Sequence, residues 1–292
     1  MAHRAAWNLP IDEVSGLGRR RNPRTGHPEL LAIGDREAAV ATLPADAAGG
    51  LPLDGDHRRA AERWDVTGLP EELRGSSGQS DWEGVAGDAA GRVFVLRETG
   101  SELLVLSPTF ELETVVSLHW EKDRGSTLES VLLLEDGRLL SITQERPLRL
   151  LEFAAPGAHA SGPGPTAPLP PDEPMRLPSG QELHAVASWV LLDDRLKSAN
   201  ELAVSGGRLF VISSLSRCIA RFPLPRAETD ILEPDSVWQL PKDVAAGHGK
   251  AEGLIVDEEF GILVGVDRQP GERGPNLHDL GPTWLGERPR PR

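Results

Sequence analysis

The stretch EGLIVDEEFGILVGVD, residues 252–267, decides the fold, because its plan recurs four more times along the 292-residue chain. A three-residue motif opens each copy: a small or acidic residue, then Gly, Ser or Glu, then an aliphatic residue. A turn and a second apolar strand follow in most copies. The motifs are Ser15-Gly16-Leu17, Glu83-Gly84-Val85, Glu129-Ser130-Val131, Asn200-Glu201-Leu202 and Glu252-Gly253-Leu254. Internal self-similarity of this kind indicates a repeat architecture.

Most copies continue with a third strand and then a segment that carries a tryptophan: Trp64, Trp120, Trp189 or Trp238. A strand–turn–strand–corner–strand–strand unit of roughly 45–70 residues is typical of one propeller blade. No stretch keeps a 3.6-residue apolar period, so helices are expected to be minor. The sequence predicts an all-β protein in which residues 1–292 form a single β-propeller. Five four-stranded blades are expected, with six as the alternative.

The last copy is too short to include a tryptophan strand, and the N-terminus offers one. Ala6-Trp7-Asn8-Leu9-Pro10 matches Val237-Trp238-Gln239-Leu240-Pro241 in pattern. We therefore predict that the N-terminal segment is the outer strand of the last blade. Closing the ring in this way removes an open sheet edge that would otherwise pair with other chains.

Two stretches do not fit the repeat, residues 45–62 and 155–182, and both are expected as insertions between third and fourth strands. The second is rich in Gly and Pro. A segment of that composition is expected to form no core of its own. It is either a surface loop or a lid.

Composition excludes several classes of function. Lys and Arg total 31 against 45 Asp and Glu, and the net charge of −14 argues against nucleic-acid or anionic-membrane partners. The same charge favours a metal or a cationic ligand. Cys218 is the single cysteine, which excludes an internal disulfide, and its apolar neighbours predict a buried thiol. Neither a signal peptide nor an 18-residue apolar run is present, so a soluble cytoplasmic protein is expected.

The first motif position supplies the candidate metal site. The first strand of each propeller blade lines the central channel, so equivalent residues converge on one axis. The predicted set is Ser15, Glu83, Glu129, Asn200 and Glu252. These oxygen donors suit Ca²⁺ best, with Mg²⁺ or Mn²⁺ as alternatives. A divalent ion would relieve the repulsion among three carboxylates. The competing interpretation is that these residues only cap the inner strands.

A second ring follows the second strands, and from it we predict ligand-binding residues Arg36, Glu98, Glu145, Asp267 and Arg268. These side chains either neutralise one another or use their arginines to bind a carboxylate or phosphate in a bidentate manner. His248 precedes Glu252 by four residues. It is the candidate general base beside a metal-activated water, with a surface loop histidine as the alternative.

The repeat resembles the SdiA-regulated family of bacterial propellers and the related phytase-like esterases. The resemblance rests on residues 247–254 (GHGKAEGL), 81–85 (DWEGV) and 13–17 (EVSGL). Departures occur at Glu129-Ser130 and Asn200-Glu201, where Gly is usual at the second position. More broadly, Ser198-Ala199-Asn200-Glu201-Leu202-Ala203 is similar to the Asn-Gly-Leu-Ala motif of gluconolactonase and strictosidine-synthase-like propellers. That similarity implies a divalent cation held at the starts of the inner strands.

Three functions are compatible with these observations. The first is a metal-dependent hydrolase of an ester, lactone or phosphoester at the channel. The second is a non-catalytic propeller that binds a small molecule or a protein on its channel face, with a structural metal or none. The third is a carbohydrate or cell-surface binder, which the absent signal peptide disfavours. No Gly-x-Ser-x-Gly elbow, Ser-His-Asp order or phosphate-binding glycine loop is present.

Overall fold

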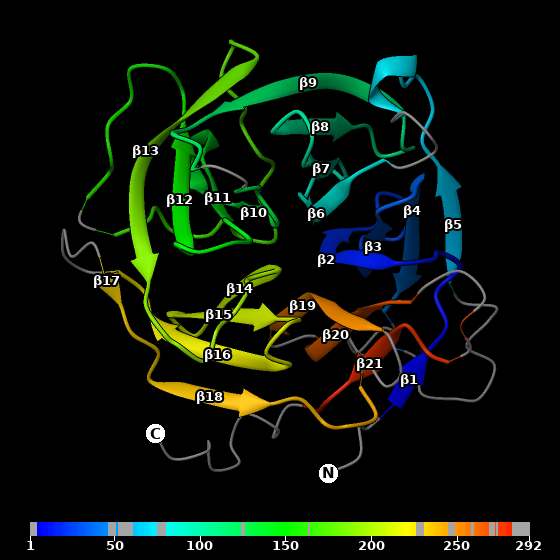
Figure 1. Ribbon diagram of the computed structural model, residues 1–292. Coiled ribbons are helices and arrows are strands. Elements are labelled where there is room, and N and C mark those ends of the chain that lie inside the picture. Colours follow the sequence, from blue (N-terminus) through cyan, green and yellow to red (C-terminus); the bar gives the residue numbers. More distant parts are fainter. Residues whose placement is uncertain are drawn as a thin grey trace.

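The computed structural model describes residues 5–45, 51, 61–74, 80–123, 126–162, 164–225, 231–244, 249–257, 260–268, 272 and 274–281. Strands dominate these ranges, and short 3-10 turns occur at Glu71–Leu73 and Glu135–Gly137. Across these residues, no helix is long and apolar enough to span a lipid bilayer. The sheets are arranged around a common centre, which is the architecture of a β-propeller (Figure 1).

Three of the sheets have four antiparallel strands each. One comprises β2 (Val14–Arg21), β3 (Pro28–Gly34), β4 (Glu37–Pro44) and β5 (Glu62–Asp65). Another comprises β14 (Glu201–Ser205), β15 (Arg208–Ser213), β16 (Cys218–Pro223) and β18 (Ser236–Gln239). The third comprises β19 (Lys250–Asp257), β20 (Gly261–Asp267), β21 (Leu277–Asp279) and β1 (Ala5–Trp7).

A nine-stranded sheet contains two further runs of four antiparallel strands. The first run is β6 (Trp82–Gly87), β7 (Val93–Arg97), β8 (Glu102–Leu106) and β9 (Leu112–His119). The second is β10 (Leu132–Leu133), β11 (Leu139–Ile142), β12 (Arg149–Ala154) and β13 (Glu182–Leu191). Strands β9 and β13 pair in parallel and join the runs, and β17 (Ile231–Leu232) pairs in parallel with β13.

The core lies between neighbouring sheets, which pack face to face. One cluster places Phe94 of β7 with Phe153 of β12. Another places Trp189 of β13 with Phe222 of β16. Both faces of a sheet are covered by neighbouring sheets. The middle strands therefore have continuous runs of apolar residues rather than alternating polar and apolar residues. The run at residues 93–96 is an example, because all four of its side chains are buried.

The N-terminal strand completes the last sheet, as the tryptophan match predicts. Strand β1 pairs with β21, with Ala5 opposite Asp279 and Trp7 opposite Leu277. Asn276 strengthens this closure, because its Nδ2 donates to the Ile11 carbonyl at 2.8 Å and its Oδ1 accepts from the Leu9 amide at 2.7 Å. The paired strand is thus shorter than the matched segment 6–10. The residues after the strand are held by hydrogen bonds to the Asn276 side chain instead of by backbone pairing with another strand.

The tryptophans of the outer strands serve packing between sheets. Trp7, Trp189 and Trp238 are each members of an apolar cluster that spans two sheets. Trp64 packs against its cluster and stacks on Phe110, with ring centroids 5.5 Å apart. Their recurrence along the sequence therefore marks repeat positions rather than a ligand-stacking platform.

The segment between β12 and β13 contributes a side chain to a core that the strands form. Met175 is 2% exposed and belongs to the cluster between the two runs of the nine-stranded sheet. Its amide donates to Asp88 Oδ2 at 3.0 Å, and Thr166 Oγ1 donates to Glu152 Oε1 at 2.7 Å. Proline prevents regular strands here, yet single side chains anchor the segment to the sheets beneath it. Of the other insertion, 45–62, the described residues are 45, 51, 61 and 62.

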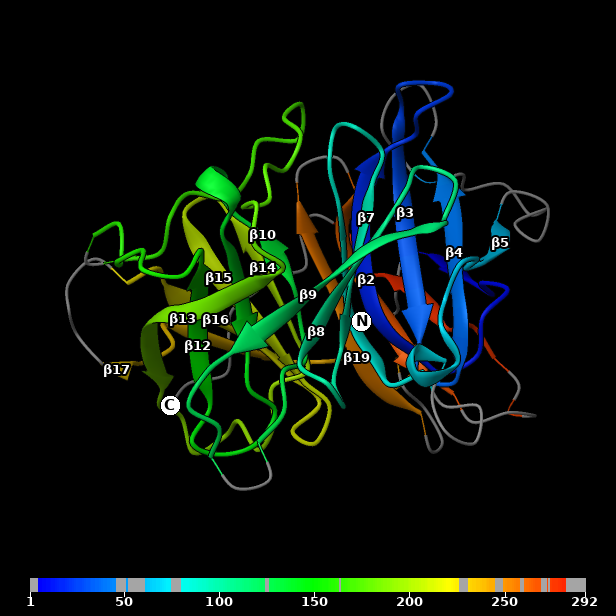
Figure 2. The ribbon, with the colours of Figure 1, turned by 90° about the horizontal axis from the view of Figure 1, so that it is seen from above.

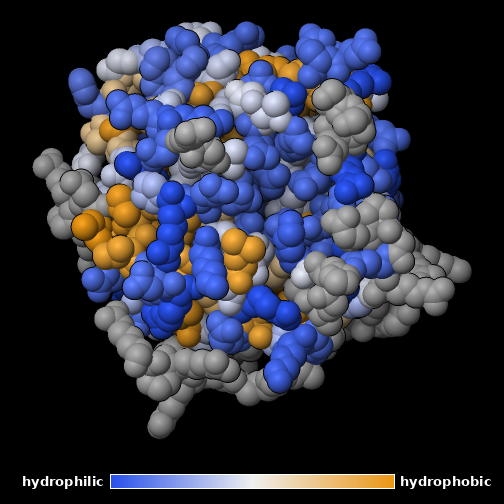
Figure 3. All heavy atoms as spheres, in the orientation of Figure 1, coloured by the Kyte–Doolittle hydropathy of each residue, from blue (hydrophilic) through white to orange (hydrophobic). Residues whose placement is uncertain are grey.

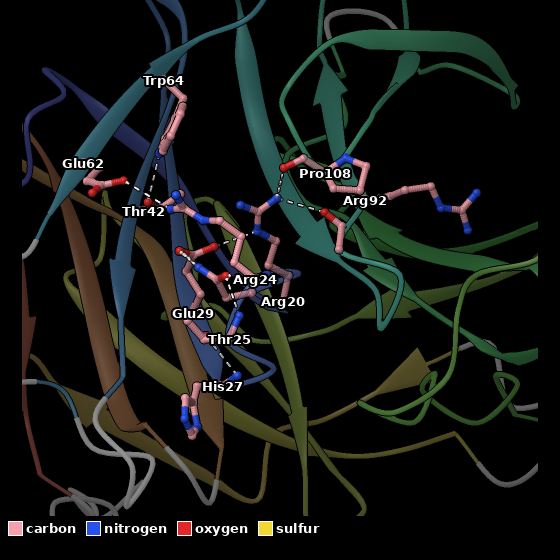
Figure 4. A network of polar contacts seen from close by, with 12 residues as sticks. Arg20, Arg24, Thr25, His27, Glu29, Thr42, Glu62, Trp64, Arg92 and Pro108 are labelled. Atoms are coloured by element: carbon pink, nitrogen blue, oxygen red, sulfur yellow. Dashed lines mark hydrogen bonds and ion pairs between the residues drawn. The ribbon is translucent and has the colours of Figure 1, made fainter.

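A buried ion pair joins β2 to β3, and its arginine also reaches the next run of strands (Figure 4). Arg20 Nε lies 2.7 Å from Glu29 Oε2, and both side chains are almost fully buried. Arg20 Nη1 donates to the carbonyls of Gly91 at 2.9 Å and Pro108 at 3.1 Å. The guanidinium also lies over the Phe110 ring, 4.4 Å from its centroid. One side chain of β2 therefore provides hydrogen bonds to backbone carbonyls in two loops of the neighbouring run.

The face of the ring that Figure 1 views is covered mainly by hydrophilic residues, with hydrophobic residues confined to small patches (Figure 3). This surface agrees with the high content of charged residues, 26% of the chain. Most of the apolar side chains of the strands are instead buried in clusters.

Removing the closing strand should open the ring. Deletion of residues 1–10 is expected to lower the free energy of unfolding by at least about 3 kcal/mol, because it removes the buried Trp7 ring and exposes the edge of β21. Urea denaturation measures the loss, and light scattering reports association through the edge. The control is Asn8→Ala, whose exposed side chain should matter little. An unchanged midpoint after the deletion would show that the ring is closed elsewhere.

Breaking the Arg20–Glu29 pair should be costly. Arg20→Met leaves the Glu29 carboxylate buried without its cation, and we expect a loss of about 3–5 kcal/mol in urea denaturation. Arg24→Met is the matched control, since Arg24 is exposed and its ion pair with Glu62 spans 3.9 Å. Equal effects of the two substitutions would contradict a structural role for the buried pair.

Candidate functional site

Local irregularities of the inner strands aim the motif residues at the centre. Strands β2, β6, β10, β14 and β19 lie nearest the centre of the ring (Figure 1). The pairing of β2 and of β6 with the following strand shifts register at the motif, with Ser15 and Glu83 as the extra residues. The register of β19 shifts between Ala251 and Leu254, where Glu252 lies. Bulges of this kind redirect side chains and are common beside functional sites.

Close packing of the inner strands explains the small second residue of the motif. A Cβ on Gly16 would lie 2.9 Å from the Glu83 carbonyl oxygen, and one on Gly84 would lie 2.7 Å from Ser130 Cα. A Cβ on Gly253 would lie 2.6 Å from Leu17 Cγ. The inner strands therefore approach backbone to backbone. This approach brings the preceding motif residues together at one end of the axis.

Three of the five predicted metal ligands form a buried acidic group. Burial, and next the negative charge of Glu129, raises the pKa of Glu83 well above its ordinary value. Burial and the charge of Glu98 do the same for the pKa of Glu129, which Thr127 opposes by hydrogen bonding. Burial raises the pKa of Glu252 to about 8, although the charge of Lys250 lowers it. These carboxyls feel one another's charge, as convergent residues must.

A second set of carboxyls adjoins the first. Burial raises the pKa of Asp35 to about 6, while a side-chain hydrogen bond with Glu83 lowers it. The pKa of Asp267 is also raised, mainly by burial, and Lys250 opposes the rise. Asp35 Oδ1, Asp267 Oδ1 and Glu13 Oε1 are buried and have no hydrogen-bond partner. Orphaned buried carboxylate oxygens are rare, and such oxygens are the donors that a hard cation takes. The residues thus fit a divalent ion.

The other two predicted ligands are already engaged. Asn200 Oδ1 accepts from Ser198 Oγ and from the Ser214 amide, both at 3.0 Å, which occupies both lone pairs of the oxygen. Its Nδ2 points to Glu252 Oε1 at 3.4 Å. Ser15 Oγ donates to the carbonyl of Trp82 on the adjacent inner strand. In this geometry Asn200 orients Glu252, and Ser15 ties two strands together.

Glu129 is held from both sides of its carboxylate. Thr127 Oγ1 donates to Oε1 at 2.9 Å, and Gln144 Nε2 donates to Oε2 at 3.0 Å. Two neutral donors orient a carboxylate without neutralising it. Glu129 therefore keeps its capacity to bind a cation when ionised.

The second predicted ring divides into two groups. Glu98 and Asp267 adjoin the central carboxyls, as the charge interactions of Glu98 with Glu129 and of Asp267 with Glu252 show. The arginines are used differently: Arg36 pairs with Glu13, and Arg268 Nε donates to the Pro275 carbonyl at 2.7 Å.

Two further predicted residues lie apart from these contacts. Glu145 is exposed. His248 lies outside the described residues, so its role as general base stays a prediction. Cys218 is buried, as the sequence predicts, and burial raises the pKa of its thiol to about 12, which leaves little thiolate for nucleophilic chemistry.

Sequence reasoning missed Lys250 and Asp35 as members of the site. Lys250 Nζ lies 3.7 Å from Glu252 Oε1 and 3.6 Å from Asp267 Oδ2. It stands two residues before the motif, at the repeat position that Glu13 and Thr127 also occupy. This shared position in the repeat could have identified Lys250 as a residue of the site. Asp35 directly precedes Arg36, a predicted ligand-binding residue, in the sequence.

Glu201 is a further missed residue. It occupies the second motif position, where three of the other copies have glycine, and it is 2% exposed. Burial raises its pKa well above the ordinary value, although backbone hydrogen bonds from Leu202 and Leu17 lower it. Its Oε2 has no partner. The departure from glycine was visible in the sequence, and it marks a large side chain placed where the other copies have glycine or serine.

A cavity of about 150 Å³ lies along the inner strands. Aliphatic residues Leu17, Val85 and Leu254 line it, together with Pro168–Pro171 of the segment between β12 and β13. Glu201 also lines this cavity and feels the charge of Glu129. Charged residues such as Arg19, Asp88 and Asp257 line the cavity as well, and Glu201 connects this mixed cavity with the acidic end of the axis.

Comparisons with known proteins place the chain among propellers. No protein-family model matches it, and no curated protein matches its sequence. A glutaminyl cyclase from Myxococcus xanthus is similar in structure, with a TM-score of 0.52 at 15% identity over 91% of each chain. A proposed gluconolactonase has a TM-score of 0.46 at 15% identity, over 96% of this chain and 81% of that one.

The chain spans less than two thirds of other similar structures. It covers 65% of a streptogramin B lyase, with 89% of this chain matched at 11% identity and a TM-score of 0.42. It covers 64% of a Bacteroides caccae protein of unknown function, with 81% of this chain matched at 11% identity and a TM-score of 0.41. At these identities the likeness supports the fold alone.

The acidic group should make the metal-free protein less stable at higher pH. Glu83, Glu129 and Glu252 keep their protons to higher pH when folded than when unfolded. Between about pH 5 and about pH 8 the unfolded chain therefore binds fewer protons, and the free energy of unfolding falls as pH rises. Urea denaturation in chelator across this range measures the slope.

Two matched variants test whether the central carboxyls cause this dependence of the free energy of unfolding on pH. Glu252→Gln removes one titrating carboxyl and should flatten the dependence, whereas Glu113→Gln changes an exposed residue of β9 and should leave it unaltered. A stability that rises with pH in the wild-type protein would contradict the protonation states inferred for this group.

Proposed function

We propose that the acidic group of Glu83, Glu129 and Glu252 binds one divalent cation, with Ca²⁺ preferred and Mg²⁺ or Mn²⁺ as alternatives. We further propose that the protein is a metal-dependent hydrolase of an ester, lactone or phosphoester. The observation that carries the proposal is the convergence of buried carboxyls whose pKa values are raised by one another and by burial. A site that holds several acids in a space where they repel is disfavoured unless a cation joins them.

Charge and donor chemistry support a hard ion. Glu83, Glu129 and Glu252 supply up to three negative charges against two on the ion, and orphaned oxygens of Asp35 and Asp267 adjoin them. The described part of the site offers no thiol and no imidazole, so zinc and copper suit it less well. Glu98 adds a further acid to this end of the axis.

The chain's own groups have roles that fit hydrolysis. A bound divalent ion would act as a Lewis acid toward a carbonyl or phosphoryl oxygen. Asp35 adjoins Glu83, and burial raises its pKa in the metal-free protein, so it is the candidate to accept a proton from water. Lys250 has a half-exposed side chain at the edge of the group, where it can hold an anionic part of a substrate. His248 is a second candidate base.

The proposal extends to architecture and partners. We propose five blades, counting each run of four antiparallel strands as one blade, with the nine-stranded sheet counted as two. We also propose membership of the SdiA-regulated family, which the repeated motifs of the inner strands support. A small-molecule substrate at the acidic end of the channel is the proposed partner. A nucleic acid or an anionic membrane is disfavoured by the net charge of −14.

Glu252→Gln tests the site. The amide keeps the shape of the side chain but removes a charge, so we expect Ca²⁺ affinity to fall on the order of tenfold or more. Titration calorimetry and thermal shift measure the affinity, and hydrolysis of aryl ester, lactone and phosphate monoester substrates with and without chelator measures the activity. Glu113→Gln is the matched control, since it removes a charge from an exposed strand.

The outcomes separate the candidate functions. Hydrolysis that disappears with chelator while the protein stays folded supports the enzyme. Ca²⁺ binding that changes stability without any hydrolysis favours a scaffold with a structural ion. If Ca²⁺, Mg²⁺ and Mn²⁺ all give no heat and no thermal shift, the acidic group is not a metal site and the proposal is wrong.

A further inference from the structure

A second candidate metal site lies on the outside of the ring, away from the central carboxyls. It consists of His119, the last residue of β9, and of Glu182 and His184 at the start of β13. One ligand atom from each residue lies within 4.8 Å of the others. Glu182 Oε2 is 3.5 Å from His119 Nε2 and 3.9 Å from His184 Nε2. The three side chains are each about half exposed.

Strand pairing, rather than side-chain rotation alone, places these residues together. Strands β9 and β13 pair in parallel, and Figure 2 shows where the two strands meet. In this pairing His119 lies opposite His184. Successive residues of a strand alternate between faces, so Glu182 and His184 point to the same side. Leu118 and Leu183, a paired couple between them, are buried on the other side. The backbone therefore commits all three polar side chains to the outer face.

The donor set and the spacing suit a borderline divalent metal. Zn²⁺ binds imidazole nitrogen and carboxylate oxygen at about 2.0–2.2 Å, so tetrahedral ligands stand roughly 3.3 Å apart. The two measured separations from Glu182 are near this value, and rotation of exposed side chains can supply the rest. Two imidazoles favour Zn²⁺, Ni²⁺ or Cu²⁺ over Ca²⁺ or Mg²⁺, which take oxygen ligands. A water can complete the coordination at this open surface.

We propose that His119, Glu182 and His184 bind one Zn²⁺-class metal ion, which fastens the two four-stranded runs of the nine-stranded sheet to each other. The ion would lie where the segment between β12 and β13 rejoins the ring. Gln181, the last residue before β13, is already held there: its carbonyl accepts from the Ser117 amide at 2.9 Å, and its Nε2 donates to Thr114 Oγ1 at 3.0 Å. Residues 168–171 of the same segment line the central cavity. A metal ion at the outer edge would thus help to hold in place a segment that lines the central cavity.

Titration of the full chain with Zn²⁺ tests the site, with Co²⁺ as a spectroscopic probe. The expected result is one saturable equivalent, a raised melting temperature, and Co²⁺ absorption bands typical of nitrogen and oxygen ligands. His119→Ala and His184→Ala should each weaken binding at least about tenfold. His27→Ala, which removes an exposed histidine elsewhere, should leave binding unchanged.

Further controls separate this site from the central one. Glu252→Gln should retain the Zn²⁺ equivalent, and excess Ca²⁺ should not displace it. Circular dichroism of the metal-free histidine variants should match the wild-type protein, because the replaced side chains are exposed. Equal Zn²⁺ binding by wild type and by the double variant His119→Ala/His184→Ala would overturn the proposal, as would the absence of any heat or thermal shift with Zn²⁺.

Discussion

The backbone-to-backbone approach of the inner strands is the constraint on which the rest of the molecule depends. Gly16 and Gly84 have no room for a side chain, because each faces the backbone of the next inner strand. That contact sets how far the sheets reach toward the axis, and the apolar wedges between the sheets fill the space that widens outward. It also forces the preceding residue of the motif toward the centre. One steric requirement therefore governs both the ring and the acidic group.

The acidic group lowers the stability of the metal-free protein locally, and other parts of the fold offset this loss. Several buried carboxyls with raised pKa values do not stabilise a metal-free protein. The ring is held by other interactions, which include the apolar clusters between sheets, the Arg20–Glu29 pair and the N-terminal strand. A site that disfavours folding but persists within a stable framework is typical of functional residues.

The sequence predicted the repeat far better than the chemistry of the site. The motif copies, the tryptophans and the match around Trp7 predicted strand order and closure, because these depend on local pattern and repetition. They also predicted that Glu83, Glu129 and Glu252 would meet. What the pattern did not contain was which oxygens are already used: the engagement of Asn200 and Ser15 depends on hydrogen bonds to other strands.

Other features arise only from contacts distant in the sequence. The burial of Met175 within a Gly- and Pro-rich segment depends on Asp88, 87 residues away. The meeting of His119 with His184 depends on a parallel pairing between two runs of strands. No local composition or periodicity encodes such pairings, so they were outside the reach of the sequence.

The closing pair of strands also has a consequence for how the chain is made. Leu9 and Asn276, which are bonded at the closure, are separated by 267 residues. At a synthesis rate of about 5–20 residues per second, the first strand leaves the ribosome roughly 13–50 seconds before its partner. During that interval β1 lacks its pairing partner, so one edge of this strand is open. Strand β1 is therefore made before the other strands of its sheet, and it can pair only after β21 has been synthesised.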